Sequence, residues 1–420
     1  MHASMSAAAS PALRDGDEVL LLCHRIPYPP DKGDKIRSYR WLTALAQRYR
    51  VHLGAFVDDA RDWEHAEPLR RLCDEVCLRP LPPLRARLRA LRALLTGAPL
   101  TIACYRDAAM AAWTRELLAR RPVGCVVLYS SAMAQYAQTA EGVLPRHVID
   151  YVDVDADKWR QYAERSRAPM AWLYARESRR LLAYDAQAAQ AACASLFVSS
   201  PEAALFRRLT GVTAPLTALP NGVDHEFFAP ATGRGNPFAG DRPAIVFTGA
   251  MDYWANVDAV RWFATAVWPK VQAAAPAARF CVVGARPSGE VLALAGDDIL
   301  VTGRVPDVRP YLQHAAAVVA PMRIARGIQN KILEGMAMAR PVVTTTMGLE
   351  GIEAVAGQHL LVADEPVAMA ERIAAVLRGA HAGLGPAARA LVSERYNWSA
   401  AKARFLDAVT GESEPAQVDA

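Results

Sequence analysis

The stretch that decides the fold is RIARGIQNKILEGMAMARPVV, residues 323–343. An apolar run at 317–320 precedes it, a helical pattern starts near Gly327, and a second apolar run follows at 341–345. A strand, a glycine-containing loop and a helix in this order bring together the N–H groups of the helix start and the positive end of the helix dipole. The stretch therefore predicts a phosphate site at the end of a buried strand.

The charged side chains of this stretch suit a nucleoside diphosphate. Arg323, Arg326 and Lys331 offer cationic partners for the two phosphates. Glu334 lies further along the predicted helix, where a carboxylate can accept hydrogen bonds from the hydroxyls of a ribose.

Apolar runs of strand length alternate with helical segments on both sides of this stretch. They fall at residues 19–23, 51–56, 125–129, 147–149, 196–199, 244–248, 279–283, 299–302, 317–320 and 341–345. Apolar runs without polar alternation are typical of parallel strands covered by helices on both faces. The pattern predicts an α/β fold of doubly wound sheets, in which ligands bind at the carboxyl ends of the strands.

The chain is long enough for two domains. It has 420 residues, and the segment 229–242, APATGRGNPFAGDR, is polar and rich in glycine and proline. We expect a first domain over 1–228 and a second over 229–397, facing each other across a cleft.

Composition disfavours several classes of protein. The net charge of +5 is too small for a nucleic-acid-binding protein, so we expect no nucleic-acid partner. No apolar run approaches the ~18 residues that span a bilayer, and the start of the chain lacks a signal-peptide pattern. We therefore expect a cytoplasmic location. An odd number of cysteines, seven, disfavours a disulfide framework.

The pattern K-x-x-E-x-M-A-x-x-x-P-V-V, read from Lys331 to Val343, resembles the donor-binding helix of retaining glycosyltransferases of family 4, which have the GT-B fold. The segments 219–228 (LPNGVDHEFF), 247–260 (FTGAMDYWANVDAV) and 301–311 (VTGRVPDVRPY) keep the order of that family. The resemblance implies two Rossmann-like domains, with the final helix, within 398–420, returning to the first. It also implies a nucleotide-diphosphate sugar donor, bound by Gly249, Asn256, Arg304, Arg323, Arg326, Gly327, Asn330, Lys331 and Glu334.

The first half of the chain carries a more distinctive pair of segments. Residues 24–37, HRIPYPPDKGDKIR, stand where this family places its acceptor-side loop. Together with 150–159, DYVDVDADKW, they are similar to the sugar transferases associated with exosortase and PEP-CTERM exopolysaccharide systems. The resemblance implies a glycan or lipid-linked acceptor, and the acceptor-side candidates are His24, Lys32, Gly33, Arg37, Asp153 and Asp155.

A purely structural role is an alternative for His24 and for the acidic run that contains Asp153 and Asp155. His24 closes an apolar run, where a histidine is also commonly structural. The acidic run at 150–157 fits a helix N-cap cluster as well as an acceptor-side carboxylate. Its spacing also resembles a calcium loop, but Lys158 stands where that loop needs glycine, so we expect no metal.

The chain departs from the family pattern at two positions. The family often has two glutamates eight positions apart, and here Arg326 occupies the first of them. The family's glycine loop often reads Gly-Arg, whereas Gly249 is followed by Ala250. We expect Arg323 and Arg326 to supply the missing charge, and the catalytic candidates are Asp153, Arg323 and Lys331.

The resemblance implies retaining sugar transfer in exopolysaccharide or other glycan biosynthesis, without a metal or a cofactor. Two alternatives stay open: a non-catalytic subunit that binds a nucleotide sugar, and a nucleotide-sugar epimerase of the same fold. A dinucleotide oxidoreductase is disfavoured because the chain has no G-x-G-x-x-G fingerprint.

Residues 84–96, LRARLRALRALLT, predict a basic amphipathic helix. Leu84, Leu88, Leu91 and Leu95 recur at helical spacing among four arginines, and the stretch contains no acid. Such a helix can lie on an anionic membrane, whereas an ordinary helix would keep the charged face in water. We expect peripheral contact with the inner face of a membrane.

Overall fold

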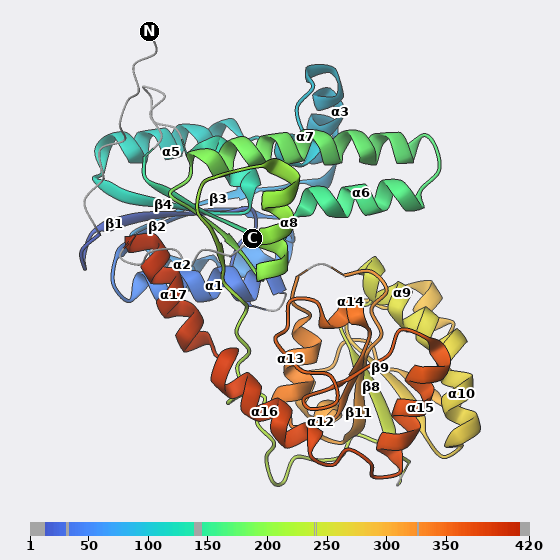
Figure 1. Cartoon of the computed structure of the whole chain (residues 1–420). Helices are drawn as coiled ribbons and strands as arrows, with labels where there is room; N and C mark the ends of the chain where they lie inside the picture. The colour runs from blue at the N-terminus through green and yellow to red at the C-terminus, as the bar shows by residue number, and fades with distance from the viewer. Residues whose placement is uncertain are drawn as a thin grey trace. The chain divides into compact units, whose positions relative to one another are not determined.

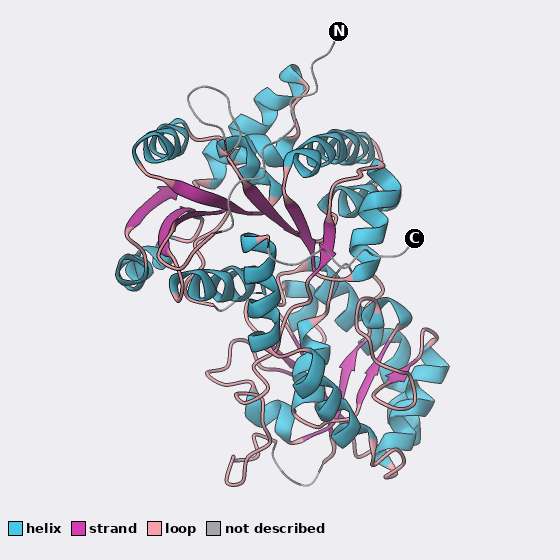
Figure 2. Ribbon diagram, turned by 60° about the vertical axis from the view of Figure 1, so that its left-hand side comes forward, coloured by secondary structure: helices cyan, strands magenta, loops and turns pink. Residues whose placement is uncertain are grey.

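The computed structural model describes residues 13–30, 33–137, 145–238, 240, 242–325 and 327–411. The chain folds into two compact units (Figure 1). The first comprises Met1–Leu219 with Lys402–Ala420, and the second comprises Pro220–Ala401. Each unit holds a sheet between layers of helices, as the strands and helices of Figure 2 show.

The first unit is built on a seven-stranded parallel sheet in the order β3-β2-β1-β4-β5-β6-β7. Its strands are β1 (Glu18–Cys23), β2 (Arg50–Val57), β3 (Glu75–Pro80), β4 (Val123–Tyr129), β5 (His147–Val152), β6 (Ala194–Phe197) and β7 (Leu216–Ala218). Its helices are α1 (Gly33–Ala46), α2 (Ala66–Leu72), α3 (Pro83–Thr96), α4 (Leu100–Cys104), α5 (Ala108–Arg120), α6 (Asp155–Arg165), α7 (Met170–Ala191) and α8 (Ser200–Thr210), with the 3₁₀ segments Ala60–His65 and Ser131–Tyr136.

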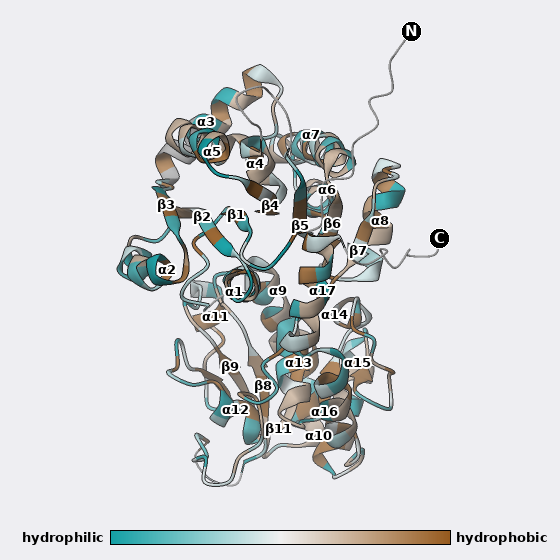
Figure 3. Ribbon diagram, turned by 90° about the vertical axis from the view of Figure 1, so that its left-hand side faces the viewer, coloured by the Kyte–Doolittle hydropathy of each residue, from teal (hydrophilic) through white to brown (hydrophobic). Residues whose placement is uncertain are grey.

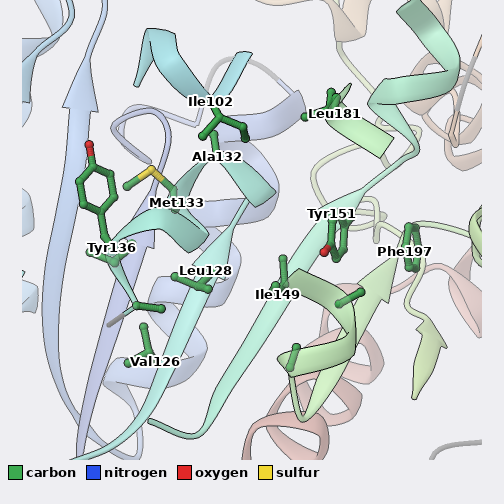
Figure 4. Packing of buried hydrophobic residues seen from close by; sticks show 14 of the residues in the cluster. Ile102, Val126, Leu128, Ala132, Met133, Tyr136, Ile149, Tyr151, Leu181 and Phe197 are labelled. Carbon is green, nitrogen blue, oxygen red and sulfur yellow. The ribbon is translucent and has the colours of Figure 1, made fainter. Parts of the chain in front are cut away.

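Buried apolar side chains between the sheet and its helices form the core of the first unit. Val126, Leu128 and Ile149 point from the strands towards Ile102 and Leu181 of the covering helices (Figure 4). Helices α3, α5 and α7 lie on one side of this sheet and α1 on the other in both Figure 1 and Figure 3.

The second unit repeats the plan with a six-stranded parallel sheet in the order β10-β9-β8-β11-β12-β13. Its strands are β8 (Ala244–Thr248), β9 (Arg279–Val283), β10 (Ile299–Val301), β11 (Ala315–Ala320), β12 (Val342–Thr344) and β13 (Leu361–Val362). Its helices are α9 (Trp254–Trp262), α10 (Trp268–Ala274), α11 (Gly289–Leu292), α12 (Arg309–Gln313), α13 (Asn330–Ala337), α14 (Thr346–Leu349), α15 (Pro366–Leu377) and α16 (Leu384–Arg395), with a π turn at Phe263–Val267 between α9 and α10.

The helices of the second unit form two layers. Helices α10 and α15 pack together against one face of the sheet, while α13 packs with α16 on the other. The apolar strands β8 and β11 lie between the layers and are coloured brown in Figure 3. An α/β fold with two parallel, helix-covered sheets is therefore confirmed.

The two units divide at Leu219, before the boundary at 228 that we expected. Arg389 explains why the intervening segment belongs with the second unit, because its guanidinium donates to the carbonyls of His225, at 3.3 Å, and Phe228, at 3.4 Å. Val223 also bridges to Asn397.

The last helix, α17 (Trp398–Thr410), begins in the second unit and ends in the first. Phe405 stacks on Trp41 of α1 with the ring centroids 4.3 Å apart. Arg404 donates to the carbonyl of Ala218 at 2.9 Å. The final turns of this helix therefore complete the packing around α1.

Candidate functional site

Three glycines bring the ends of neighbouring strands together at the carboxyl edge of the second sheet. Gly249 donates to Val283 O at 3.1 Å, and Gly284 donates to Gly303 O at 3.2 Å. A Cβ atom on Gly284 would lie 1.7 Å from Gly249 O, so only glycine fits there. The three loops after β8, β9 and β10 therefore form one backbone-built frame, which we call the glycine frame.

Helix α13 places Lys331 beside this frame. The Lys331 ammonium lies 3.1 Å from Asn256 Oδ1 and 3.3 Å from Gln329 Oε1, and 5.4 Å from the centroid of the Phe247 ring. Asn256 is buried, and its amide nitrogen donates to Ala250 O at 2.9 Å. Asn256 thus joins the lysine to the loop after Gly249, and its role in binding a donor stays a prediction.

Burial brings the pKa values of Lys331 and Glu334, the two charged residues of α13, closer together. It lowers the pKa of Lys331 to about 8. It also raises the pKa of Glu334 to about 7, an effect that the nearby Lys331 ammonium reduces. No hydrogen-bond donor of the described residues contacts the Glu334 carboxylate. The helix thus offers an under-solvated cation for a diphosphate, and a carboxylate that can accept from hydroxyl groups.

The remaining donor-side candidates differ in burial and in their contacts. Gly327 is buried with φ +67°, a left-handed conformation that does not fit inside a right-handed helix, and α13 starts at Asn330 instead of the expected Gly327. The Asn330 side-chain oxygen accepts from Asn221 Nδ2 at 3.4 Å. Arg304 is exposed directly after Gly303. Arg326 lies outside the described residues.

Arg323 is already paired. Its Nε lies 3.1 Å from Asp258 Oδ2, its other arm contacts the same carboxylate, and the guanidinium carbon lies 5.7 Å from the Trp262 ring centroid. This pair is partly exposed, so a ligand phosphate can compete with Asp258 for the guanidinium. That Arg323 supplies the charge of the arginine that is absent after Gly249 stays a prediction.

In the first unit, the acidic candidates gather at the carboxyl edge of the sheet. Lys158 Nζ lies 2.6 Å from Asp153 Oδ1 and 2.9 Å from Asp155 Oδ1. Burial raises the pKa of Asp153; for Asp155 the same burial is outweighed, mainly by the Lys158 ammonium, and its pKa is lowered. The two carboxylates therefore differ in proton affinity although they share one lysine.

His24 follows β1 at the same edge. Its ring stacks on Tyr129 at 5.7 Å between centroids, and its Nε2 lies 3.7 Å from Asp34 Oδ2. Burial lowers the pKa of His24, an effect that Asp34 opposes. Gly33 is exposed at the start of α1, and Lys32 lies outside the described residues.

The prediction that Arg37 faces an acceptor is wrong. Its side chain is buried and bonds Asp150 at 2.7 and 3.1 Å and the carbonyl of Leu219 at 2.9 Å. Trp41 Nε1 donates to the same Asp150 at 2.6 Å. Arg37 forms an ion pair with Asp150, which lies 113 positions away in the sequence. The residues around Arg37 in the sequence do not reveal this partner.

Asp150 in turn supports a strained turn before Asp153. Val152 has φ +69°, a conformation that costs a β-branched residue on the order of 1–3 kcal/mol. The Val152 N–H donates to Asp150 Oδ1 at 3.1 Å, and its carbonyl accepts from Val198 at 2.6 Å. Arg37 therefore acts on Asp153 as a positioning residue, through Asp150.

An aromatic cluster that was not predicted from the sequence lies on α6 and α7, after these carboxylates in the chain. Trp159, Tyr162 and Tyr174 pack with their ring centroids 5.4 to 5.9 Å apart, and all three are partly exposed. The spacing of Trp159 and Tyr162 along one helix face was the available signal, but Tyr174 comes from α7. Partly exposed rings beside carboxylates can bind both the apolar face and the hydroxyls of a sugar.

Neither a metal cluster nor a membrane-spanning helix is found in the part of the chain that the structure describes. No three His, Cys, Asp or Glu side chains within it are grouped to hold a metal ion. No helix within it has both the length and the apolar character to cross a bilayer.

Comparisons with known proteins agree on the fold. Sucrose-phosphate synthase from Thermosynechococcus elongatus is similar with a TM-score of 0.70 at 17% identity, covering 93% of this chain and 97% of that one. HepE of Anabaena, solved in complex with UDP, is similar with a TM-score of 0.65 at 14% identity, covering 94% and 100%. OtsA is similar with a TM-score of 0.64 at 10% identity, covering 94% and 99%. A search of curated protein sequences gives no match.

A family model identifies the second unit more closely. The model described as Glycosyl transferases group 1 matches residues 242–379, which span the glycine frame and α13. The chain thus carries a glycosyl transferase group 1 domain on a GT-B fold.

Proposed function

We propose that the protein is a retaining glycosyltransferase that transfers a sugar from a nucleotide-diphosphate sugar to a glycan or lipid-linked acceptor in exopolysaccharide or related glycan biosynthesis. The observation that carries the proposal is the arrangement of Lys331 and Glu334 on α13 beside the glycine frame. The resemblance of 24–37 and 150–159 to transferases of exosortase and PEP-CTERM systems supports the exopolysaccharide role.

Lys331 is the residue proposed to hold the diphosphate. Its ammonium is partly desolvated, and among the described residues it contacts the neutral Asn256 and Gln329 oxygens and the Met322 sulfur, so an anion gains more from it than from an exposed lysine. Glu334, one turn further, accepts from the ribose hydroxyls. HepE is solved with UDP and with UDP-glucose, so UDP-sugars are the first donors to test.

The proposed reaction keeps the anomeric configuration. The bond from the sugar C1 to the phosphate oxygen breaks, and the acceptor hydroxyl oxygen bonds to C1 on the same face. The acceptor proton passes to the departing phosphate oxygen. Lys331 and Arg323 stabilise the negative charge that develops on the diphosphate, which places the charge stabilisation on protein side chains.

The acceptor is proposed to bind at the carboxyl edge of the first sheet. Asp153 and Asp155 form one polar cluster with Lys158, and Trp159 and Tyr162 follow it along α6. Carboxylates accept hydrogen bonds from sugar hydroxyls, and aromatic faces pack on the C–H face of a pyranose.

Titration calorimetry and turnover test the donor site. Purified protein is titrated with UDP, GDP and ADP, and with their sugars. Lys331→Ala and Glu334→Gln should each weaken the binding of the preferred nucleotide sugar by about 30-fold or more, as expected for truncating one partner of a buried charged bond. Lys270→Ala and Glu371→Gln are matched controls, because both side chains are exposed. Unchanged affinity in both site variants would remove the assignment.

Two further measurements separate the alternatives. Proton NMR of the product gives its anomeric configuration, and inversion would refute the retaining mechanism. Binding without turnover across donors and acceptors would indicate a non-catalytic subunit, and a new nucleotide sugar formed without acceptor would indicate an epimerase. Asp153→Asn should lower transfer while leaving the donor affinity near that of the unchanged protein.

A further inference from the structure

The most apolar exposed surface of the first unit lies on α3 and the first turn of α7. Leu84, Leu91 and Leu95 of α3 are 74%, 60% and 90% exposed. Met170 and Trp172 at the start of α7 are 41% and 61% exposed. Large apolar side chains exposed to this extent on adjoining elements mark an interaction surface.

Contacts with α7 and α4 hold α3 in this position. Arg176 of α7 is buried and donates to the carbonyls of Ala93 at 3.0 Å and Ala98 at 3.3 Å. Glu177 accepts from the N–H groups of Leu100 and Thr101 at 2.6 and 2.8 Å. The small, buried Ala93 therefore faces the body of the unit and leaves the leucines outside, on the side of the sheet away from α1 (Figures 1 and 3).

The exposed charges of α3 and of the first half of α7 are of one sign. Residues 78–106 contain no aspartate or glutamate. Arg92, Arg167, Arg179 and Arg180 are exposed, and the side chain of Arg180 lies beside Gly97 at the end of α3. Glu177, the acid nearest to them in α7, is buried and bonded to backbone N–H groups. The surface thus combines apolar side chains with arginines.

We infer that this surface, formed by Leu84, Leu91, Leu95, Met170 and Trp172 with Arg92, Arg167, Arg179 and Arg180, docks on an anionic lipid bilayer. Apolar side chains enter the acyl boundary while arginines remain at the phosphate level. A second copy of the chain fits less well, because a two-fold contact would bring the same arginines together. The inference goes beyond the proposed transfer reaction and does not depend on it.

The first test measures the sedimentation of the full chain with vesicles of phosphatidylcholine alone or mixed with phosphatidylglycerol. The unchanged protein should bind the mixed vesicles, and added salt should weaken binding. Leu91→Ser with Leu95→Ser should lower the partition coefficient about ten-fold or more. Arg92→Gln with Arg179→Gln should lower it about five-fold for each arginine, on the mixed vesicles only.

Matched controls come from the second unit. Leu292→Ser with Val367→Ser removes two side chains that are 52% and 55% exposed there, and should leave vesicle binding unchanged. Thermal unfolding verifies that every variant is folded. Absence of binding to the mixed vesicles, or equal loss in the control variant, would overturn the inference. So would a dimer in solution that the serine variants dissociate while no vesicle binding occurs.

Discussion

Replacing Lys331 by methionine should stabilise the ligand-free protein while weakening diphosphate binding. Methionine keeps an unbranched side chain that is one atom shorter, and it suits the neighbouring Phe247 ring and Met322 sulfur. The change removes an ammonium that burial penalises. It also leaves Glu334 without its cation, which offsets part of the gain.

The magnitude follows from the pKa of Lys331. A decrease from 10.5 to about 8 corresponds to about 3 kcal/mol, at about 1.4 kcal/mol for each pKa unit. This value already includes the attraction to Glu334, and we reduce it to about 2 kcal/mol because the Lys331 side chain is only partly buried. For a unit of this size, that raises the melting temperature by about 4–8 °C.

The effect depends on pH with a definite sign. The unfolded chain holds the Lys331 proton up to about pH 10.5, whereas the folded chain releases it near pH 8. The stability of the unchanged protein relative to the variant therefore rises between about pH 8 and 10.5. The advantage of the methionine variant should be full near neutral pH and should decrease steadily above pH 8.

Calorimetric unfolding at several pH values measures this difference, with Lys270→Met, an exposed lysine, as the control. A lower melting temperature for Lys331→Met at neutral pH would show that the surroundings of Lys331 stabilise its charge. A gap between the two proteins that stays constant up to pH 10.5 would refute the titration argument. Both results would leave the family assignment intact.

Three further changes test other parts of the structure. Gly284→Ala places a Cβ 1.7 Å from Gly249 O and should destabilise the second unit by on the order of 2–4 kcal/mol in chemical denaturation; an unchanged midpoint would refute the close contact. Arg37→Leu leaves Asp150 buried without its partner and should cost about 3–5 kcal/mol, whereas Arg37→Leu with Asp150→Leu should cost less; equal losses would contradict the ion pair as the cause. Burial raises the pKa of Asp185 to about 8, so folding takes up a proton and stability falls as pH rises from about 4 to 8; Asp185→Asn should remove that slope, and an identical pH profile by thermal unfolding would refute the assignment.

The fold was largely predictable because buried parallel strands are near-continuous apolar runs. Strands β8 and β9 have the expected bounds. The sequence pattern did not predict β3, which ends in a proline at the sheet edge and is only partly buried. It also missed β7 and β13, which are too short to show a pattern. Partial burial and short length leave little periodic signal in one sequence.

Proximity of candidate site residues was predictable where the residues lie in one short segment of the chain. Lys331 and Glu334 lie on one short helix, so their spacing implies their proximity. Arg37 shows the limit of such reasoning. A basic residue in a polar loop suggests a ligand-binding residue, and only the fold reveals that the Arg37 side chain is paired with Asp150. Tyr174, whose ring joins the two aromatic residues of α6, is a similar case.

The final helix has a consequence for synthesis on the ribosome. Phe405, from the end of the chain, covers Trp41, and Trp41 in turn bonds the buried Asp150. The first unit therefore emerges without one of its own packing partners and acquires it only after the whole second unit has been translated. The packing of the first unit is completed only after the second unit has been synthesised, and until then Trp41 lacks the ring that covers it.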